Sequence, residues 1–304
     1  MLFKKKRIDK NGKVIKRKGL KLGLAFGGGG ARGISHIGVV KALEELGIQA
    51  DFVAGTSAGS LVGGLYCAGF TSSQMIDELK KLRVRDIRDS KLIWKPSNSE
   101  NIEQVLKNFM GRDIVFSELQ TPLTVVAVNM KKGEQVNIDS GSVAKAISGS
   151  CAVPWVFSPV QYNDMNLVDG GLMDNVPADV VRFMGADIVI AIEVNQRRGA
   201  GTDSLKIMDV LKESVGIMMQ TNVTKSLTYA DLVLKPNMTD FSSSRLGDIE
   251  EMVKRGYDIV MANKDEIIKL VSEKPKKKVK SLWDRLIQAR EKQEKIKEKQ
   301  KIRE

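Results

Sequence analysis

Residues 22–59 read LGLAFGGGGARGISHIGVVKALEELGIQADFVAGTSAG, and this stretch decides the fold class. Residues 22–26 form a short apolar run that ends in glycines, which is typical of a buried strand. Apolar residues then recur at helical spacing over residues 34–46 and stop at Gly47. A second apolar run at residues 51–55 leads into a second helical stretch at 58–68. Two successive strand–helix units predict a parallel sheet with helices on its faces.

The rest of the chain continues this alternation. Further strands are predicted at residues 123–129, 135–138, 165–168, 188–194 and 232–234. Further helices are predicted at residues 75–82, 102–110, 143–150, 204–224 and 249–270. The 304 residues are enough for a substantial core, so we expect an α/β fold whose single folded domain spans residues 20–272.

The formal net charge of +12 is distributed unevenly. Residues 1–21 carry a net +9 and residues 274–304 a net +8, whereas residues 22–273 carry a net −5. A domain that binds nucleic acid would carry its basic charge on a folded face. The distribution therefore argues against a nucleic-acid partner and predicts two basic tails, at residues 1–19 and 273–304.

The C-terminal tail is strongly helix-forming over residues 281–303, with an apolar patch at Leu282, Trp283, Leu286 and Ile287. Such a segment suits an anionic membrane surface, where each nearby Lys or Arg contributes about 1 kcal/mol. A solvated charged tail, or a helix that docks on the core or on a partner, also fits the pattern. The basic start MLFKKKR is not followed by the apolar stretch of a secretory signal. We therefore expect a cytoplasmic protein with peripheral contact at the inner face of the membrane.

The longest uncharged window, residues 52–76, resembles a membrane span in length. Five glycines and several hydroxyl residues interrupt it, so we predict a buried strand, turn and helix instead.

The chain has two cysteines, Cys67 and Cys151, and one histidine, His36. The cysteines lie far apart in the sequence and are expected to be free buried thiols in a reducing compartment. These counts exclude a four-cysteine or histidine-rich zinc site. A single histidine also limits any catalytic scheme that needs an imidazole base.

The pentapeptide GTSAG at residues 55–59 fits the G-x-S-x-G pattern of a nucleophile elbow. It lies directly between a predicted strand and a predicted helix, which is the context that this motif requires. The helix that follows presents its N-terminal dipole to the serine and favours negative charge there. Ser57 is therefore the candidate nucleophile, although a plain Gly/Ser turn gives the same pattern.

The glycine-rich segment GGGGARG at residues 27–33 follows the first strand. Backbone N–H groups in such a loop can bind an anion, and this gives two functional interpretations. One is an oxyanion hole for acyl transfer. The other is a dinucleotide site, because Gly28, Gly30 and Gly33 fit G-x-G-x-x-G. A dinucleotide site expects an acidic residue after the second strand, but Asp51 precedes that strand, so the oxyanion hole is favoured. Because neighbouring parallel strands end at the same sheet edge, we expect the glycine loop and Ser57 side by side.

The nucleophile needs a base. His36 precedes the serine, whereas the histidine comes last in the usual α/β-hydrolase order, so we expect a structural role for it beside the glycine loop. The base is then a carboxylate, and Asp169 in the sequence VDGG is the best candidate. It follows a short extended segment and precedes two glycines that let the chain turn.

These segments together resemble the patatin-like phospholipase family, especially its short bacterial members. GGGGARG is similar to the family's oxyanion block, GTSAG to its nucleophile block and DGG to its aspartate block. ISGSCAVP at residues 147–154 is similar to a further block, with Gly149 and Cys151 as mild departures from its typical form. The resemblance covers about residues 20–270, so we identify the folded domain as a patatin-like acyl hydrolase domain.

The resemblance implies a three-layer α/β/α sandwich with a mainly parallel central sheet. It also implies a lipid acyl hydrolase of phospholipase A or esterase type that uses a Ser–Asp dyad without a metal or organic cofactor. Ser57 and Asp169 match the dyad, and the oxyanion hole matches Gly28, Gly29, Gly30 and Arg32. The substrate is then a lipid or another acyl ester.

Two alternatives remain open. An acyltransferase or thioesterase would use the same dyad with another acceptor or substrate, and a non-catalytic protein with this fold would bind a membrane or a partner. Residues 83–101 mix charged and apolar residues and form either a flap over the serine or a plain surface loop.

Overall fold

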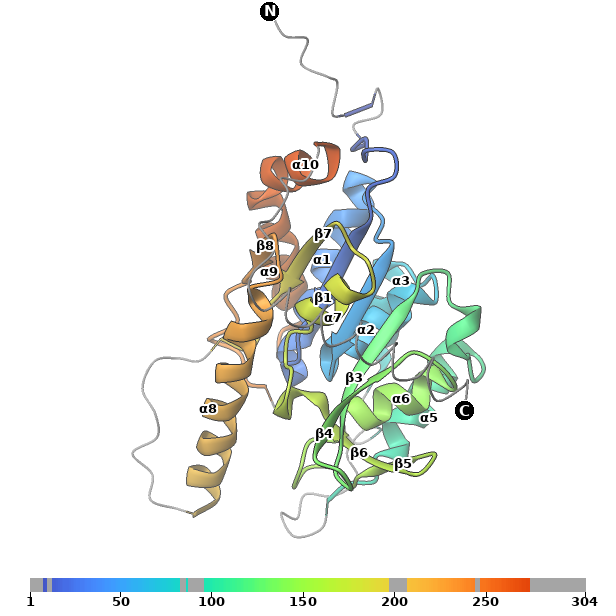
Figure 1. Cartoon of the computed structure of the whole chain (residues 1–304), viewed down its shortest axis with the longest axis vertical. Coiled ribbons are helices and arrows are strands. Elements are labelled where there is room, and N and C mark those ends of the chain that lie inside the picture. Colours follow the sequence, from blue (N-terminus) through green and yellow to red (C-terminus); the bar gives the residue numbers. More distant parts are fainter. Residues whose placement is uncertain are drawn as a thin grey trace, which may run out of the picture. The chain divides into compact units, whose positions relative to one another are not determined.

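A mixed eight-stranded sheet runs through the computed structural model, which describes residues 8–9, 13–82, 86, 96–196, 207–243 and 247–273 (Figure 1). The strand order is β5-β6-β3-β2-β1-β7-β8, and β4 pairs with β3 outside this path. Parallel pairing joins β1 (Leu22–Phe26), β2 (Phe52–Thr56), β3 (Leu123–Asn129), β7 (Ile188–Ile192) and β8 (Leu232–Leu234). Antiparallel pairing adds β4 (Glu134–Ile138), β5 (Val160–Tyr162) and β6 (Met165–Asp169).

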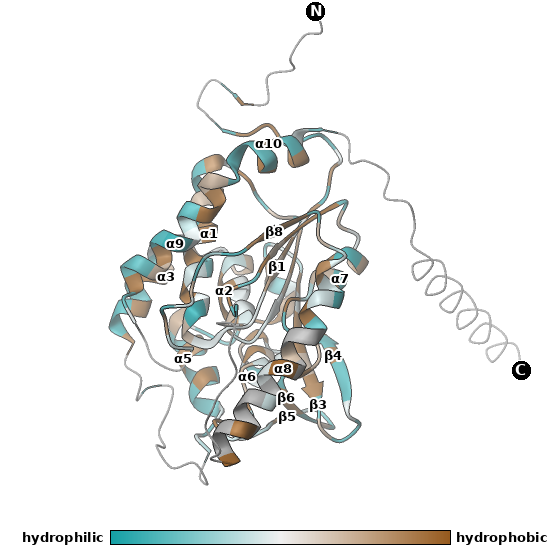
Figure 2. Cartoon of the chain, turned by 90° about the vertical axis from the view of Figure 1, so that its left-hand side faces the viewer, coloured by the Kyte–Doolittle hydropathy of each residue, from teal (hydrophilic) through white to brown (hydrophobic). Residues whose placement is uncertain are grey.

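Helices cover both faces of this sheet, and Figure 2 shows it between α1, α3 and α9 on one side and α7 on the other. The first layer holds α1 (Ser35–Leu46), α2 (Ala58–Cys67), α3 (Ser72–Lys81), α5 (Glu100–Met110), α6 (Val143–Ser150), α9 (Ile249–Ala262) and α10 (Lys264–Ser272). The second layer holds α7 (Ala178–Phe183) and α8 (Ile207–Leu227). Short 3-10 turns occur at η1 (Gly30–Ile34), η2 (Phe116–Glu118) and η3 (Gly170–Leu172). The predicted three-layer α/β/α sandwich is confirmed.

The two faces of the central strands carry side chains of different size. Successive residues of a strand point to opposite faces. Large residues such as Leu24 and Phe26 pack toward the first layer. Small residues, including Ala25, Ala54 and Ala191, pack toward Val180, Val181 and Val223 of α7 and α8. The small residues leave room for the short helix α7 to approach the sheet closely.

Most predicted elements occur at or near their expected places. The strands at 22–26, 123–129 and 232–234 and the helix at 143–150 have the predicted bounds. The predicted helix at 249–270 is instead two helices, because α9 ends at Ala262, α10 begins at Lys264, and Asn263 caps both. Sequence patterns missed β5, because its three residues are not a continuous apolar run as those of β8 are, and α7, because six residues are too few to show a helical period.

Helices α1 and α9 pack against each other through glycines. A Cβ at Gly38 of α1 would overlap the carbonyl oxygen of Val253, and a Cβ at Gly256 of α9 would overlap that of Ser35. The two backbones therefore lie close together at reciprocal positions, which makes α9 a rigid neighbour of α1.

The described residues of the basic N-terminal segment contact α1 and α10. Val14 is buried, and its N–H donates to the Leu46 carbonyl at 2.8 Å. The Lys13 ammonium donates to the Glu44 and Glu45 carbonyls at the C-terminal end of α1, where a positive charge is favourable. The Arg17 N–H donates to the Val271 carbonyl at 2.8 Å. These hydrogen bonds attach residues 13–17 to the C-terminal ends of α1 and α10.

Two other predicted segments lie outside the described residues. The C-terminal tail, for which the sequence predicts a helix with an apolar patch, falls within Lys274–Glu304, and none of these residues is described. Of residues 83–101, expected to form either a flap or a plain surface loop, residues 83–85 and 87–95 are not described.

Over the described ranges, no helix has the length and apolar character needed to cross a membrane. The uncharged window at 52–76 forms β2, α2 and the start of α3, as the glycines within it predict.

Candidate active site

Ser57 occupies a strained turn between β2 and α2. Its φ of 52° and ψ of −127° lie in a region that non-glycine residues rarely adopt and that costs about 1–3 kcal/mol. The flanking glycines make the turn sterically possible. A Cβ at Gly55 would lie 2.6 Å from the Ser60 Cα, and a Cβ at Gly59 would overlap the carbonyl oxygen of Phe26. The GTSAG segment therefore adopts the elbow geometry that the sequence predicts.

Hydrogen bonds hold the Ser57 backbone in this conformation. Its N–H donates to Ser150 Oγ at 2.8 Å, and Ser150 Oγ donates to the Val126 carbonyl at 2.6 Å. The Ser57 carbonyl accepts from Ser60 Oγ at 2.6 Å. The strain is thus fixed by buried polar contacts to α6, β3 and α2.

The strand register brings Asp169 to Ser57. On β3, Val126 pairs with Thr56 of β2, and the next residue, Ala127, pairs with Asp169 of β6. Because β4 pairs with the opposite edge of β3, β2 and β6 share one edge and their carboxyl ends meet there. The residue that follows Thr56 therefore lies beside Asp169, although 112 positions separate Ser57 and Asp169 in the chain.

Asp169 is a buried carboxyl group with a raised pKa. Burial raises the pKa of Asp169 to about 6, while hydrogen bonds with the Gly171 N–H and the Ser57 side chain oppose this rise. The Gly171 N–H donates to Asp169 Oδ1 at 2.7 Å, and the Asp169 N–H donates to the Ala152 carbonyl at 3.0 Å. Gly170 is needed in this turn because a Cβ there would overlap the Val126 carbonyl. At neutral pH the carboxyl is ionised and more basic than an ordinary aspartate.

Cys151 lies in the same cluster, which the sequence did not indicate. Burial and the nearby charge of Asp169 raise the pKa of the Cys151 thiol, and side-chain hydrogen bonds with Ser60 and Ser57 oppose this rise. The thiol is therefore protonated at neutral pH. Both Cys67 and Cys151 are free and buried, as predicted.

The glycine loop lies beside Ser57, as the parallel pairing of β1 and β2 predicts. A Cβ at Gly28 would be 3.2 Å from the Ser57 Cβ and 2.5 Å from Asn175 Oδ1. Asn175 holds Gly28 at both ends: its carbonyl accepts from the Gly28 N–H at 2.9 Å, and its Nδ2 donates to the Gly28 carbonyl at 3.2 Å. The Gly28 N–H is thus engaged within the protein.

The next two amides of the loop differ from that of Gly28. Within the described part of the chain, neither the Gly29 nor the Gly30 N–H donates a hydrogen bond. The same holds for the N–H groups of Ala58 and Gly59 in the first turn of α2, where the helix dipole favours an anion. Of the three expected oxyanion donors, Gly28 thus has its N–H engaged by Asn175, whereas the Gly29 and Gly30 N–H groups donate to no described residue.

Arg32 contacts neighbouring segments. Its Nε donates to the Phe241 carbonyl at 2.9 Å, and its Nη1 donates to Asn195 Oδ1 at 3.1 Å and to the Gln196 carbonyl at 3.3 Å. These contacts fit an arginine that holds the loop.

His36 occupies the structural position expected for it. Its Nε2 donates to the Gly27 carbonyl at 2.7 Å, and its ring meets the Phe26 ring edge-on with centroids 5.2 Å apart. Burial lowers the pKa of His36 to about 4, so the imidazole is neutral at neutral pH. It supports the start of the glycine loop.

A second buried carboxyl lies behind the site. Burial and the neighbouring Asp179 raise the pKa of Asp174 well above its usual range, and the Asp174 carbonyl accepts from Thr56 Oγ1 at 2.8 Å.

Sequence reasoning missed Asp174 and Asn175, and it did not single out Ser150. The sequence held one signal for these three residues. Each is a polar residue among apolar neighbours, in LMDNVP at residues 172–177 and in ISGSCAVP at residues 147–154. Over the described ranges, no group of three or more His, Cys, Asp or Glu residues is arranged to hold a metal.

The chain is similar to known proteins in sequence and in fold. A family model of patatin-like phospholipases matches residues 24–182. An uncharacterised NTE family protein of Mycobacterium tuberculosis is 34% identical over 186 residues, which cover 58% of this chain and 49% of that protein. A lysophospholipase of Kluyveromyces lactis is 34% identical over 184 residues, covering 58% of this chain and 13% of that protein. The chain thus spans about half the length, or less, of these relatives.

A solved structure also shares the fold. VipD from Legionella pneumophila superposes with a TM-score of 0.57 at 16% identity, covering 84% of this chain and 68% of that one.

Proposed function

Because this chain belongs to the patatin-like phospholipase family, we propose that it is a serine hydrolase of lipid carboxylic esters, of phospholipase A or esterase type. One observation carries the proposal: a serine in a strained elbow lies beside a buried carboxylate and next to a loop with two N–H groups that donate to no described residue. Nucleophile, base and anion site are the three parts that acyl transfer needs.

In the proposed mechanism Asp169 accepts the proton of the Ser57 hydroxyl while Ser57 Oγ attacks the ester carbonyl carbon. The carbonyl oxygen becomes an oxyanion and accepts hydrogen bonds from the Gly29 and Gly30 N–H groups. Arg32 holds the loop that contains these two glycines in place. The alkoxide leaves with the proton from Asp169, which gives an acyl-enzyme. Water then attacks this ester, Asp169 takes a proton from the water, and Ser57 regains it as the fatty acid departs. Every step uses residues of the chain and water alone.

Exposed apolar side chains near Asp169 support a lipid substrate. Val153 follows Ala152, whose carbonyl binds the Asp169 N–H, and Trp155 is 46% exposed with a φ of 66°. Met173 follows η3 and is also exposed. Helix α8 contacts Gly171 through Met219, and Ile217, two residues before Met219, is exposed. Apolar residues around a catalytic group suit acyl chains better than a small polar ester.

The lysophospholipase among the relatives suggests the first substrate to test. We expect the purified protein to release fatty acid from a lysophospholipid and from short acyl p-nitrophenyl esters. Ser57→Ala and Asp169→Asn should each abolish release, whereas Asp164→Asn, an exposed turn carboxylate, should leave it unchanged. Full activity in a folded Ser57→Ala or Asp169→Asn protein would exclude the dyad.

Two further measurements separate the alternatives. Labelling of Ser57 by a fluorophosphonate, absent in Ser57→Ala, would exclude a non-catalytic protein. Product analysis then distinguishes hydrolysis from acyl transfer: free fatty acid supports the hydrolase, an acylated second lipid supports an acyltransferase, and preferential cleavage of acyl thioesters supports a thioesterase.

We further propose that the basic terminal segments bring the protein to the anionic inner face of the membrane. The net +8 of residues 274–304 and the apolar patch around Trp283 support this placement. Deletion of residues 275–304 should reduce co-sedimentation with anionic vesicles, and raising the salt concentration should reduce binding of the full chain. Equal binding with and without the segment would exclude its role.

A further inference from the structure

Residues 237–243, here called the strap, pass directly over the glycine loop. The Ser243 carbonyl accepts from the Ala31 N–H at 2.9 Å, and the Phe241 carbonyl accepts from Arg32 Nε at 2.9 Å. Gly30 has a φ of 55°, and a Cβ there would overlap the Ser243 carbonyl oxygen. The strap therefore contacts the loop at the residues that adjoin the amides of Gly29 and Gly30.

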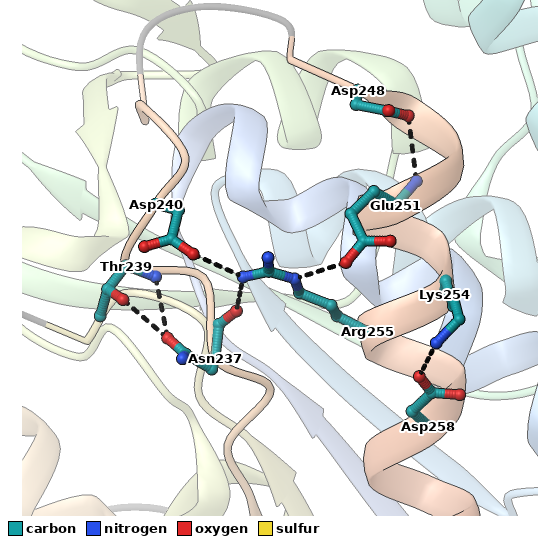
Figure 3. A network of polar contacts seen from close by, with 8 residues as sticks. All are labelled: Asn237, Thr239, Asp240, Asp248, Glu251, Lys254, Arg255 and Asp258. Carbon is teal, nitrogen blue, oxygen red and sulfur yellow. Dashed lines mark hydrogen bonds and ion pairs between the residues drawn. The ribbon is translucent and has the colours of Figure 1, made fainter.

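Arg255 of α9 holds the other side of the strap (Figure 3). Its Nη1 donates to the Asn237 carbonyl at 2.8 Å and to Asp240 Oδ2 at 3.2 Å. Its guanidinium also lies 4.9 Å from the centre of the Phe241 ring. One side chain thus contacts the strap at a backbone carbonyl, a carboxylate and an aromatic face, a combination that suits the planar fork of arginine.

Arg255 is itself fixed on a rigid support. Its Nε donates to Glu251 Oε1 at 2.9 Å, one helical turn earlier, and Asp248 Oδ1 caps this helix by accepting from the Glu251 N–H at 3.1 Å. The close glycine packing described above fixes α9 against α1, and α1 begins directly after the turn η1 that contains Gly30. The glycine loop is thus attached to α1 by the chain and to α9 by the strap.

We propose that Arg255 is a positioning residue for the oxyanion site, and that it acts through the strap on the orientation of the Gly29 and Gly30 N–H groups. This inference rests on the proposed function, in which those two amides bind the oxyanion. Hydrogen-bond strength falls steeply as the donor turns away from its acceptor. The oxyanion forms only in the transition state, so a loosened loop lowers kcat and leaves substrate binding nearly unchanged.

The test compares Arg255→Gln and Arg255→Lys with Lys254→Gln in the full chain. Lys254 precedes Arg255 on α9, and its side chain is 65% exposed. Among the described residues it pairs only with Asp258, at 2.5 Å, away from the strap (Figure 3). We expect Arg255→Gln to lower kcat by about tenfold with KM within twofold, a smaller loss than the roughly 100-fold or more seen when an oxyanion donor is removed outright. Arg255→Lys should retain part of the rate, and Lys254→Gln should match the parent chain.

A second readout reports on the oxyanion site itself. A trifluoromethyl ketone with a fatty acyl chain forms a tetrahedral oxyanion adduct with a catalytic serine. Its inhibition constant should rise in Arg255→Gln by the same factor by which kcat falls, because both depend on the same N–H donors. A variant that is merely less stable would lower the active fraction and leave this constant unchanged.

The outcomes separate this inference from the proposed function. Ester hydrolysis by the parent chain that is lost in Ser57→Ala establishes the function, and only Arg255 is then in question. Unchanged kcat and unchanged inhibition in folded Arg255→Gln, or an equal loss in Lys254→Gln, would overturn the positioning role. If Arg255→Gln does not fold, Asp240→Ala removes the carboxylate that accepts from Arg255 Nη1 and is expected to give a smaller loss of the same kind; full activity there would count against the role.

Discussion

Asp169→Asn should abolish hydrolysis and at the same time stabilise the fold. Burial raises the pKa of Asp169 from its ordinary value of 3.8 to about 6, so the folded protein disfavours the ionised carboxyl. Keeping it ionised at pH 8 therefore costs up to about 3 kcal/mol, at 1.36 kcal/mol per pH unit. Asparagine is neutral and can still accept the Gly171 N–H that binds Oδ1. Removal of the charge removes this cost.

The stability gained by Asp169→Asn should depend on pH. The raised pKa means that Asp169 adds to stability while it is protonated, and this advantage is lost as the pH rises through about 6. The asparagine of the variant would not titrate. The stability difference between variant and parent should therefore be largest above pH 7, shrink between pH 6 and 4, and nearly vanish below the ordinary aspartate pKa. Other groups that titrate cancel in this difference.

Thermal melting of the two proteins at pH 5 and pH 8 measures the effect. A gain of about 3 kcal/mol corresponds to roughly 6–12 °C for a domain of this size, and we take it as the upper limit. Asp164→Asn serves as the control for loss of an exposed carboxylate and should not shift the melting temperature. A variant that melts below its parent at pH 8, or a shift that is the same at both pH values, would refute the reasoning.

Three further predictions concern the same region. The kcat/KM of the parent chain should fall about tenfold per pH unit below about pH 6, because only ionised Asp169 can accept the Ser57 proton; a rate that is flat down to pH 5 in stopped assays would contradict this. Asp174→Asn should flatten the loss of thermal stability between about pH 4 and pH 8, because the folded chain keeps Asp174 protonated up to a pKa of about 8 whereas the unfolded chain ionises it near 3.8; an equally steep loss by melting would exclude it. Gly28→Ala should lower fluorophosphonate labelling of Ser57 by 100-fold or more, on the order of a lost oxyanion donor, because its Cβ would lie 2.5 Å from Asn175 Oδ1 and 3.2 Å from the Ser57 Cβ; labelling at the parent rate would show that the loop adjusts.

The parts of the site that depend on local geometry could be predicted from the sequence. The elbow at Ser57 requires small neighbours, so Gly55 and Gly59 reveal it within five residues. The same holds for the turn after Asp169, where Gly170 avoids the Val126 carbonyl. Continuous apolar runs and helical spacing of apolar residues also predicted the approximate bounds of most long strands and helices, because these elements repeat a pattern often enough to be recognised.

The parts that depend on distant partners could not be predicted. The Gly28 N–H is engaged by the Asn175 carbonyl. Arg32 donates to the Phe241 carbonyl, more than two hundred positions away in the chain. The break between α9 and α10 lies at Asn263, inside an apolar period that continues across it. For Gly28 and Arg32 the deciding contact joins distant segments whose pairing is set by the packed fold, and it leaves no periodic pattern in either segment.

The approach of Ser57 to Asp169 is set by the point at which the sheet changes from parallel to antiparallel pairing. Along one edge of β3, β2 ends at Val126 and β6 ends at Ala127 from the opposite direction, so the two carboxyl ends face each other. A shift of β6 by one residue would move Asp169 by about 3.3 Å and turn its side chain to the other face of the sheet. Either change exceeds what a hydrogen bond tolerates. The pairing of β6 with β3 is therefore as much a part of the proposed dyad as the two side chains, and changes that weaken this antiparallel ladder should reduce activity before they unfold the parallel half of the sheet.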